Sequence, residues 1–158
     1  MIYLLPRKIL SIIHTDDKEL LNYTIIMRGQ KILSIESCDN QGHSSTYISR
    51  RVGTSKYFTT RHSEIKALHN LRKLLQKKRK INSIKVINFR LVKDHMGNIH
   101  IGNSQCCRPC CETLYRLGIN TIIYSTNNGD FVKESTSDIM EKTKYSKGSK
   151  LLFNKYNM

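Results

Sequence analysis

The chain has 158 residues, enough for one domain with its own core, and its 27 Lys and Arg residues against 12 Asp and Glu residues give a net charge of +15. That charge favours a polyanionic or phosphorylated partner, with a merely solvated surface as the alternative. The five cysteines are odd in number and clustered, which argues against a secreted disulfide scaffold and for a reducing compartment. No stretch approaches the roughly 18 apolar residues of a membrane span, and the N-terminus lacks the charge order of a signal peptide. We therefore expect a soluble intracellular protein that has no membrane partner.

Hydrophobic periodicity divides the chain into alternating strands and helices. The expected elements, in chain order, are a hairpin over 22–37, a loop over 38–55, a helix over 59–80, a strand over 83–92, a brief return strand over 99–102, a helix over 106–118, a strand over 120–126 and a turn with one further strand over 127–132. Gly29 marks the hairpin turn, Thr59 or Thr60 is expected to cap the first helix, and Gly118 is expected to end the second.

Strands that alternate with amphipathic helices predict an α/β fold. We expect an α/β/α sandwich around a single central mixed sheet of about five strands. Residues 1–140 are expected to form one domain, because no repeat or change of composition divides them. Residues 141–158 carry five lysines and no strong period, so they predict a basic, flexible C-terminal tail.

The most unusual stretch is "NSQCCRPCCETL" at residues 103–114, where four cysteines fall within six positions. Zinc ligands from one segment often have two residues between them, so that both sulfurs face the same ion. Cys107 and Cys110 form the one pair of this spacing. A redox dithiol is an alternative, and a structural zinc site would need a further pair such as His95 and His100.

A second motif lies upstream, in "TTRHSEIKALHNL", where His62 and Glu64 form H-x-E at the beginning of the first predicted helix. A strand separates this motif from the C-x-x-C pair, which begins the second helix. An H-x-E followed by P-C-x-x-C is the signature of zinc deaminases, and this chain has the same spacing with Cys106 before the first cysteine of the pair.

On these two motifs the chain resembles the cytidine/deoxycytidylate deaminase superfamily. "HSEIKAL" (62–68) is similar to the family's H-A-E-x-x-A-[LI] helix start, and "SQCCRPCCETLYRLGI" (104–119) is similar to its S-x-P-C-x-x-C segment. The apolar strand "TIIYS" follows in the family order, so the resemblance covers about residues 22–133. Cys106 stands where the family usually has proline, and a proline occurs instead at Pro109.

The resemblance implies a zinc ion held by His62, Cys107 and Cys110, with an open fourth position for a water of lowered pKa. Glu64 would be the catalytic proton shuttle that serves the attack of hydroxide on a ring carbon. Substrate contacts would come from Asn40, in a segment that loosely matches the family's G-x-N turn, and from the backbone of Ser63. Cys106 and Cys111 are expected to be bystanders.

The resemblance implies hydrolytic removal of an amino group from a nucleobase, and a nucleoside or nucleotide of the cytidine, CMP or dCMP type is the favoured substrate. The net charge of +15, the basic run at 72–80 and the lysine-rich tail support an alternative, a deaminase of single-stranded nucleic acid or tRNA. A non-catalytic zinc-stabilised nucleic-acid-binding module is the third hypothesis. Many relatives oligomerise, so a homo-oligomer is a further expectation.

Overall fold

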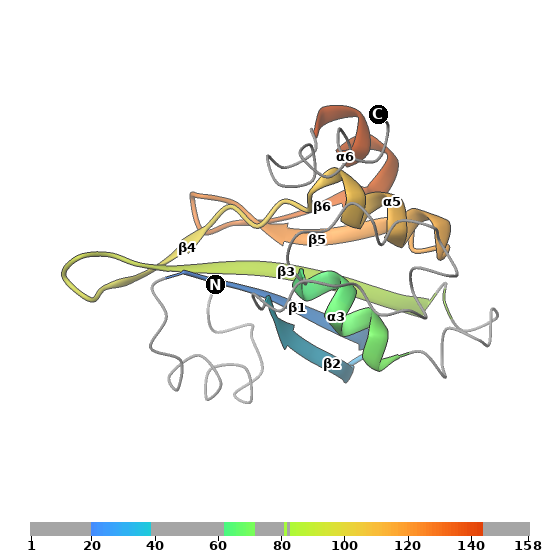
Figure 1. Ribbon diagram of the computed structural model, residues 1–158, viewed down its shortest axis with the longest axis horizontal. Helices are drawn as coiled ribbons and strands as arrows, with labels where there is room; N and C mark the ends of the chain where they lie inside the picture. Colours follow the sequence, from blue (N-terminus) through green and yellow to red (C-terminus); the bar gives the residue numbers. More distant parts are fainter. Residues whose placement is uncertain (1–19, 39–61, 72–80, 82, 144–158) are drawn as a thin grey trace, which may run out of the picture.

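One mixed sheet of six strands, with three helices, makes up the part of the chain that the computed structural model describes, which is residues 20–38, 62–71, 81 and 83–143 (Figure 1). The strands are β1 (Leu20–Arg28), β2 (Lys31–Ser37), β3 (Ile84–Lys93), β4 (Ile99–Gly102), β5 (Thr121–Ser125) and β6 (Phe131–Ser135). The helices are α3 (Ser63–Asn70), α5 (Arg108–Arg116) and α6 (Thr136–Lys142).

The strand order is β2-β1-β3-β5-β6, and β3 and β5 are its one parallel pair among the described strands. Two strands pair with the same edge of the long strand β3, each along a different part of it. β5 pairs with residues 86–88, and β4 pairs with residues 90–93. The β3–β4 hairpin extends beyond the rest of the sheet at the left of Figure 1. The edge of β3 therefore changes partner between residues 88 and 90.

Two buried serines join the chain at this change of partner. The Ser104 hydroxyl donates to the Asn88 carbonyl at 2.9 Å, and the Ser125 hydroxyl donates to the Gly102 carbonyl at 2.7 Å. The backbone N–H of Ser125 donates to Ser104 Oγ at 2.9 Å. Because buried backbone groups need hydrogen-bond partners, these hydroxyls take the place of ladder bonds that the sheet lacks here. They fix the segment that leads from β4 into α5.

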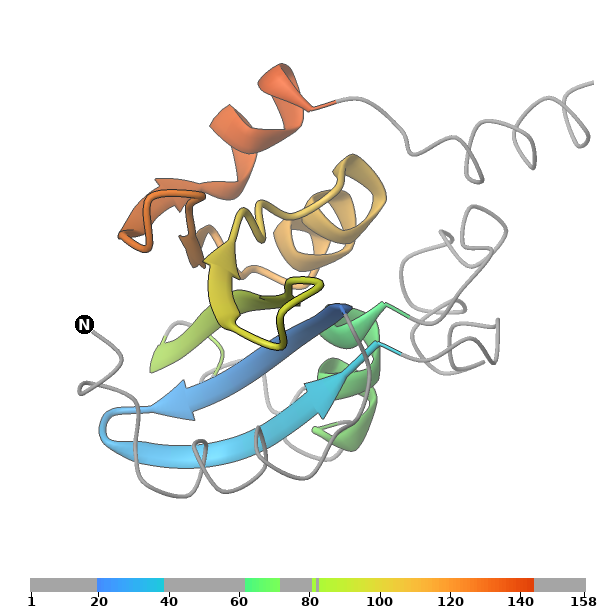
Figure 2. The same ribbon diagram turned by 90° about the vertical axis from the view of Figure 1, so that its left-hand side faces the viewer.

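The sheet buries a different set of side chains on each face, as the period of two in its strands requires. On the face covered by the helices, Ile26, Val86 and Ile122 pack with Ile65 of α3 and Leu114 of α5 in one cluster. Ile139 of α6 belongs to the same cluster. On the opposite face, Tyr23 and Phe89 stack with ring centroids 5.0 Å apart. Figure 2 shows α3 lying along one side of the β1–β2 hairpin.

The predicted α/β class with one mixed sheet is confirmed, with six strands where about five were expected. The turn at Gly29 is also confirmed, since its φ of 59° lies in the left-handed region that glycine adopts without strain. α3 begins at Ser63 with His62 as its N-cap, rather than at Thr59 or Thr60, which lie outside the described residues together with the basic run 72–80. No helix in the described part of the chain is both long and apolar enough to cross a membrane.

The sequence prediction missed one element, α6. It covers Thr136–Lys142, so it follows the last predicted strand and includes the first two residues of the predicted tail, 141 and 142. Its N-cap is Ser135, whose hydroxyl accepts from the Asp138 N–H at 3.0 Å. Within α6 the structure buries Thr136 and Ile139, a face too small to give a helical period in the sequence. Residues 144–158 of the predicted tail lie outside the described residues.

Candidate metal centre

Two helices begin at the residues of the candidate metal centre. His62 is the N-cap of α3 and Cys107 is the N-cap of α5, both with extended backbone, and Cys110 lies in the first turn of α5. Pro109 is the second residue of α5, a position where the missing N–H removes no helical hydrogen bond. The proline between the two cysteines is thus compatible with the helix start. Positive helix ends at these positions favour thiolates and other anions.

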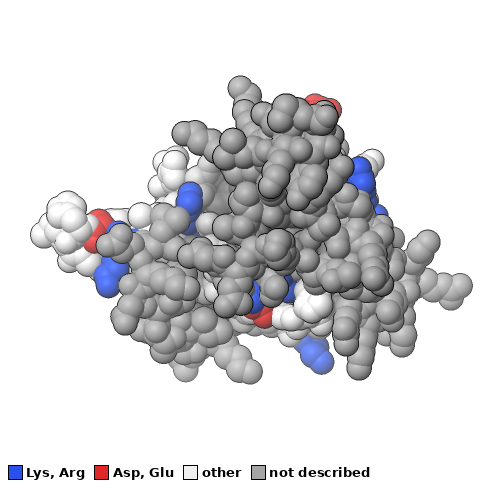
Figure 3. Space-filling view, viewed as in Figure 1, with Lys and Arg blue, Asp and Glu red and all other residues white. Residues whose placement is uncertain are grey.

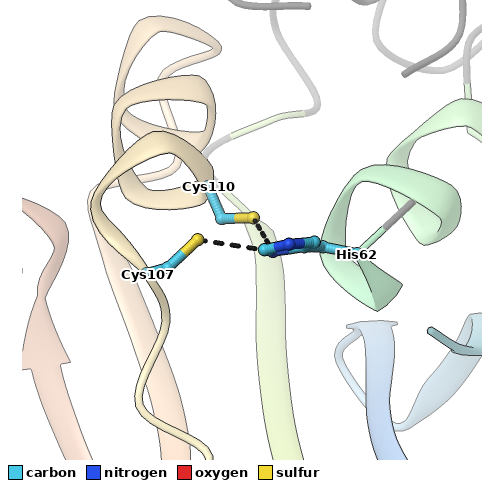
Figure 4. Close-up of side chains that lie close together, drawn as sticks. All are labelled: His62, Cys107 and Cys110. Atoms are coloured by element: carbon cyan, nitrogen blue, oxygen red, sulfur yellow. Dashed lines mark hydrogen bonds between the residues drawn. The ribbon is translucent and has the colours of Figure 1, made fainter. Parts of the chain in front are cut away.

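The imidazole of His62 comes from the α3 side and faces the sulfurs of both Cys107 and Cys110 (Figure 4). Its Nδ1 is 3.3 Å from Cys107 Sγ and 3.3 Å from Cys110 Sγ. Tetrahedral zinc with Zn–S of about 2.3 Å and Zn–N of about 2.0–2.1 Å would place such atoms about 3.6 Å apart. All three ligand atoms lie within 4.8 Å of one another. The donor set of one imidazole and two sulfurs therefore fits a zinc ion with a small outward movement.

The three groups influence one another's protonation in the absence of a metal ion. Burial by itself lowers the pKa of His62, but its hydrogen bond with Cys107 and the negative charges of Cys107 and Glu64 raise that pKa to about 9. The hydrogen bond from Cys110, aided by the one to His62, lowers the pKa of Cys107 to about 6. Burial raises the pKa of Cys110 well above its ordinary value. The charge distribution near neutral pH is one thiolate held by one imidazolium and one thiol.

A second set of three groups shares Cys110 with the first. The ligand atoms of Glu64, Cys106 and Cys110 also lie within 4.8 Å of one another. The Cys106 thiol donates to Glu64 Oε1 at 3.2 Å, and burial raises the pKa of Cys106 well above its ordinary value. Burial raises the pKa of Cys110, which belongs to both sets, in the same way, so protonation does not separate the two sets. The approach of His62 Nδ1 to both Cys107 and Cys110 at 3.3 Å, together with their C-x-x-C spacing, favours His62, Cys107 and Cys110 as ligands and leaves Glu64 next to them.

Glu64 is buried at the start of α3 and is held by Asn88 of β3, which in turn bonds to Thr24 of β1. The amide of Asn88 on β3 donates to Glu64 Oε1 at 2.9 Å, and the Asn88 Oδ1 accepts from the Thr24 hydroxyl of β1 at 2.8 Å. The Ser63 hydroxyl lies 2.8 Å from Thr24 Oγ1 and 3.4 Å from Glu64 Oε2. Among the described residues, Oε1 receives the two shorter hydrogen bonds, so Oε2 is the oxygen better able to accept a proton.

A cavity of about 240 Å³ opens beside these groups. Its described lining residues are Asn22, Tyr23, Cys38, His62, Ser63, Glu64, Asn88, Arg90, Asn103, Ser104, Gln105 and Cys107. The candidate metal ligands His62 and Cys107 therefore line one cavity with the Glu64 carboxylate and several residues that have amide side chains. Such convergence of polar and ionisable groups is typical of catalytic and binding sites.

The structure brings together four of the residues that the sequence singled out: His62, Glu64, Cys107 and Cys110. Ser63 also lines the cavity, and its side chain is bonded to neighbours rather than facing solvent. Asn40 lies outside the described residues. Cys111 is fully buried in the core, as expected of a bystander. Cys106 was also expected to be a bystander, yet its thiol contacts Glu64 directly.

The sequence reasoning missed the strand residues of the site. Thr24 and Asn88 are polar positions within apolar strands, and the register pairs them directly across β1 and β3. Asn22 and Arg90 form the next pair on the same face. A polar residue that interrupts the apolar face of a predicted strand was the available signal. The pairing itself needs the register, which the sequence alone leaves open.

Most of the positive charge lies outside the part of the chain that the structure describes. Ten of the 27 Lys and Arg residues and eight of the 12 Asp and Glu residues fall within the described ranges, which gives these ranges a net charge of +2. Several of these cations are paired, as in Lys66–Glu36 and Lys142–Glu134. On the face drawn in Figure 3, the described Lys and Arg side chains lie apart from one another. They form no continuous basic surface there.

The five cysteines are all free thiols in the structure, so a disulfide framework is excluded. His100 bonds to Asp94 at 3.1 Å in the exposed β3–β4 hairpin, and among the described residues neither it nor His95 belongs to a metal-binding group. No protein-family model matches this chain, and searches of curated proteins and of solved structures give no significant match, so the site's own residues are the basis for assigning a function.

Proposed function

We propose that this protein is a zinc-dependent hydrolytic deaminase that acts on a nucleobase of the cytidine, CMP or dCMP type. One observation carries the proposal: the Glu64 carboxylate lies within 4.8 Å of Cys110, while Cys110 is grouped with His62 and Cys107 around one point. The resemblance of the two motifs to the cytidine/deoxycytidylate deaminase superfamily supports the same assignment. Three protein ligands leave a fourth zinc position for water, which is the arrangement of a catalytic site.

A zinc ion held by His62, Cys107 and Cys110 would lower the pKa of a water in the cavity. Glu64 would accept a proton of the attacking water and deliver it to the ring nitrogen, and a second transfer would allow ammonia to leave. The products are ammonia and the base with oxygen in place of the amino group, so water supplies every added atom. Asn88 and Cys106 would hold the carboxylate in place during both transfers.

The position of Glu64 also separates this proposal from a structural zinc site. A structural ion usually has four protein ligands and needs no carboxylate beside it. Here the described residues supply three ligands, and the neighbouring carboxylate lines an open cavity. A non-catalytic zinc module leaves that arrangement unexplained.

The experiment is an ammonia-release screen of the zinc-loaded protein over cytidine, CMP, dCMP, adenosine, guanine, tRNA and single-stranded DNA. Glu64→Ala should keep its zinc and lose about 10²- to 10⁴-fold in rate, the usual contribution of a general acid–base group. Glu141→Ala, which removes an exposed carboxylate of α6, is the matched control and should leave the rate unchanged. Turnover confined to tRNA or single-stranded DNA would make the nucleic-acid alternative correct. Full activity of zinc-loaded Glu64→Ala would refute the catalytic assignment.

A further inference from the structure

The cavity extends past the candidate metal centre to a second pair of polar residues. Asn88 bonds to Glu64, and Thr24 bonds to Asn88. On the same strands these two residues are followed by the pair Asn22 and Arg90. Both members of this second pair line the cavity. Two residues along a strand span about 7 Å, so Arg90 begins roughly one sugar ring away from the residue that holds the carboxylate.

Arg90 brings a positive charge to this end of the cavity, and the described residues form no ion pair with it. Its Nε is buried, and it has no hydrogen-bond partner within the described part of the chain. Glu64 is the one acidic residue among the described lining residues, and its Oε1 is already bonded to Asn88 and Cys106. A buried guanidinium nitrogen without a partner is costly, and an anionic ligand would remove that cost.

Because Gly102 has no side chain, it leaves space for the side chain of Arg90. The two residues are directly paired between β3 and β4. A Cβ at position 102 would lie 3.3 Å from Arg90 Cδ and 3.0 Å from Val92 Cγ2, both closer than ordinary contacts. The absence of a side chain at this position thus lets the Arg90 stem lie against the backbone of β4. The chain continues from Gly102 into Asn103 and Gln105, whose amide side chains also line the cavity.

We propose that Arg90 binds a phosphate ester on the sugar of the substrate, with the base at the His62, Cys107 and Cys110 end of the cavity. The planar guanidinium presents paired donors that match phosphate oxygens, and the amides of Asn22, Asn103 and Gln105 supply further donors. A cavity of about 240 Å³ has room for about one nucleotide unit, and a longer strand would continue outside it. The placement of the base rests on the proposed function, whereas the phosphate site rests on Arg90 and its surroundings.

The test measures binding rather than turnover, by calorimetry on the zinc-loaded full chain. The probes are uridine, UMP and the dinucleotide UpU, which differ in carrying no phosphate, a phosphate monoester or a phosphate diester. Whichever of UMP and UpU binds more tightly, here called the phosphate ligand, should bind about 10- to 100-fold more tightly than uridine. This is the usual effect of a hydrogen-bonded charge pair. Arg90→Gln should abolish that advantage and leave uridine within about twofold. Lys85→Gln, an equal change of charge at an exposed residue of the same strand, should change neither.

A preference for UMP over UpU identifies a free nucleotide as the source of the phosphate, and the reverse preference identifies a nucleic-acid strand. Inorganic phosphate should compete with the phosphate ligand on the unmodified protein but not with uridine, a readout that needs no variant to fold. Equal binding of uridine, UMP and UpU, or equal weakening of all three by Arg90→Gln, would overturn the phosphate site. If the phosphate ligand binds more tightly than uridine through Arg90 but no base is deaminated, the proposed function alone is refuted. If a base is deaminated but the phosphate ligand binds no more tightly than uridine, the phosphate site alone is refuted.

Discussion

The Asn88 amide donates to Glu64 Oε1 at 2.9 Å, and this hydrogen bond joins the central strand β3 to the first turn of α3. The two residues are 24 positions apart in sequence, and both are buried. Because the Asn88 Oδ1 accepts from Thr24, the orientation of the amide is fixed and its NH₂ group must face the carboxylate. The sheet thereby sets the position of the one carboxylate that lines the cavity among the described residues.

Removal of this amide should reduce catalysis without removing the metal. We expect Asn88→Ala to lower kcat/KM for deamination by about tenfold to a hundredfold, since a hydrogen bond to a charged group contributes about 1.5–3 kcal/mol. The zinc content, measured by mass spectrometry, should stay at one ion per chain, because Asn88 contributes no ligand. Asn120→Ala, at an exposed position of the same residue type, is the control. An unchanged kcat/KM in Asn88→Ala would show that Glu64 needs no support from β3.

The sequence predicted the type of an element well where several apolar residues or a turn glycine marked it. The apolar runs of β1, β3 and β5 and the glycines at turns are local features, and the structure uses them in the expected way. α6 was missed although Ser135 and Asp138 have the S-x-x-D spacing of an N-terminal cap. Its single deeply buried aliphatic side chain, Ile139, gives no periodic signal, and packing against α5 stabilises it instead.

In the candidate site, too, the residues marked by a local pattern were predicted and the contacts between distant segments were not. The choice of Cys107 and Cys110 came from local spacing, and the structure places both sulfurs next to His62. Asn88 holds Glu64 and is itself held by Thr24, a pairing that depends on the register between two residues 64 positions apart. No local pattern contains that information. The same holds for Cys106, whose contact with Glu64 arises because α3 and α5 begin at the same point of the molecule.

The choice among the four clustered cysteines can be tested by single substitutions to serine. Cys107→Ser and Cys110→Ser should each lower zinc affinity by at least about tenfold, because each removes a thiolate ligand. Cys111→Ser, a buried residue of the same helix outside both metal-binding groups, is the control for effects of substitution in α5. Cys106→Ser should retain zinc. Loss of zinc from Cys106→Ser with retention in Cys107→Ser would instead identify Glu64, Cys106 and Cys110 as the ligands.

A stability prediction follows from the end of α5. Gly118 has a φ of 86°, and its N–H donates to the Tyr115 carbonyl at 2.9 Å, while the next N–H reaches back to Leu114 at 2.9 Å. A Cβ at Gly118 would lie 3.7 Å from Ile81 Cγ2, which is ordinary contact, so the cost of substitution comes from the backbone alone. Gly118→Ala should lower the free energy of unfolding by about 1–2 kcal/mol.

Denaturant titration of the zinc-loaded protein measures this loss. Gly118→Asn is the matched variant and should lose less, because asparagine enters the left-handed region more readily than alanine. Equal stability of Gly118→Ala and the parent chain would contradict the left-handed end of α5.

Zinc affinity should depend steeply on pH. The pKa of His62 is raised to about 9 and that of Cys110 is raised by burial, so both carry a proton at pH 7 that zinc must displace. Cys107, with its pKa lowered to about 6, is already mostly a thiolate at that pH. Between about pH 6 and pH 9 each bound ion should therefore release about two protons, and the apparent affinity should rise about a hundredfold per pH unit. Below about pH 6 the protonation of Cys107 adds a third proton and a steeper fall.

Competition with a chromophoric chelator of known pH dependence measures the affinity, and calorimetry in two buffers of different ionisation enthalpy counts the protons. Cys111→Ser should show the same slope as the parent chain, because Cys111 lies outside both metal-binding groups. Cys110→Ser should lose about one proton of the two, since the serine hydroxyl replaces the thiol that zinc would deprotonate. An affinity that is flat between pH 6 and pH 9 would mean that neither His62 nor Cys110 gives up a proton to zinc, and would contradict the raised pKa values of both groups.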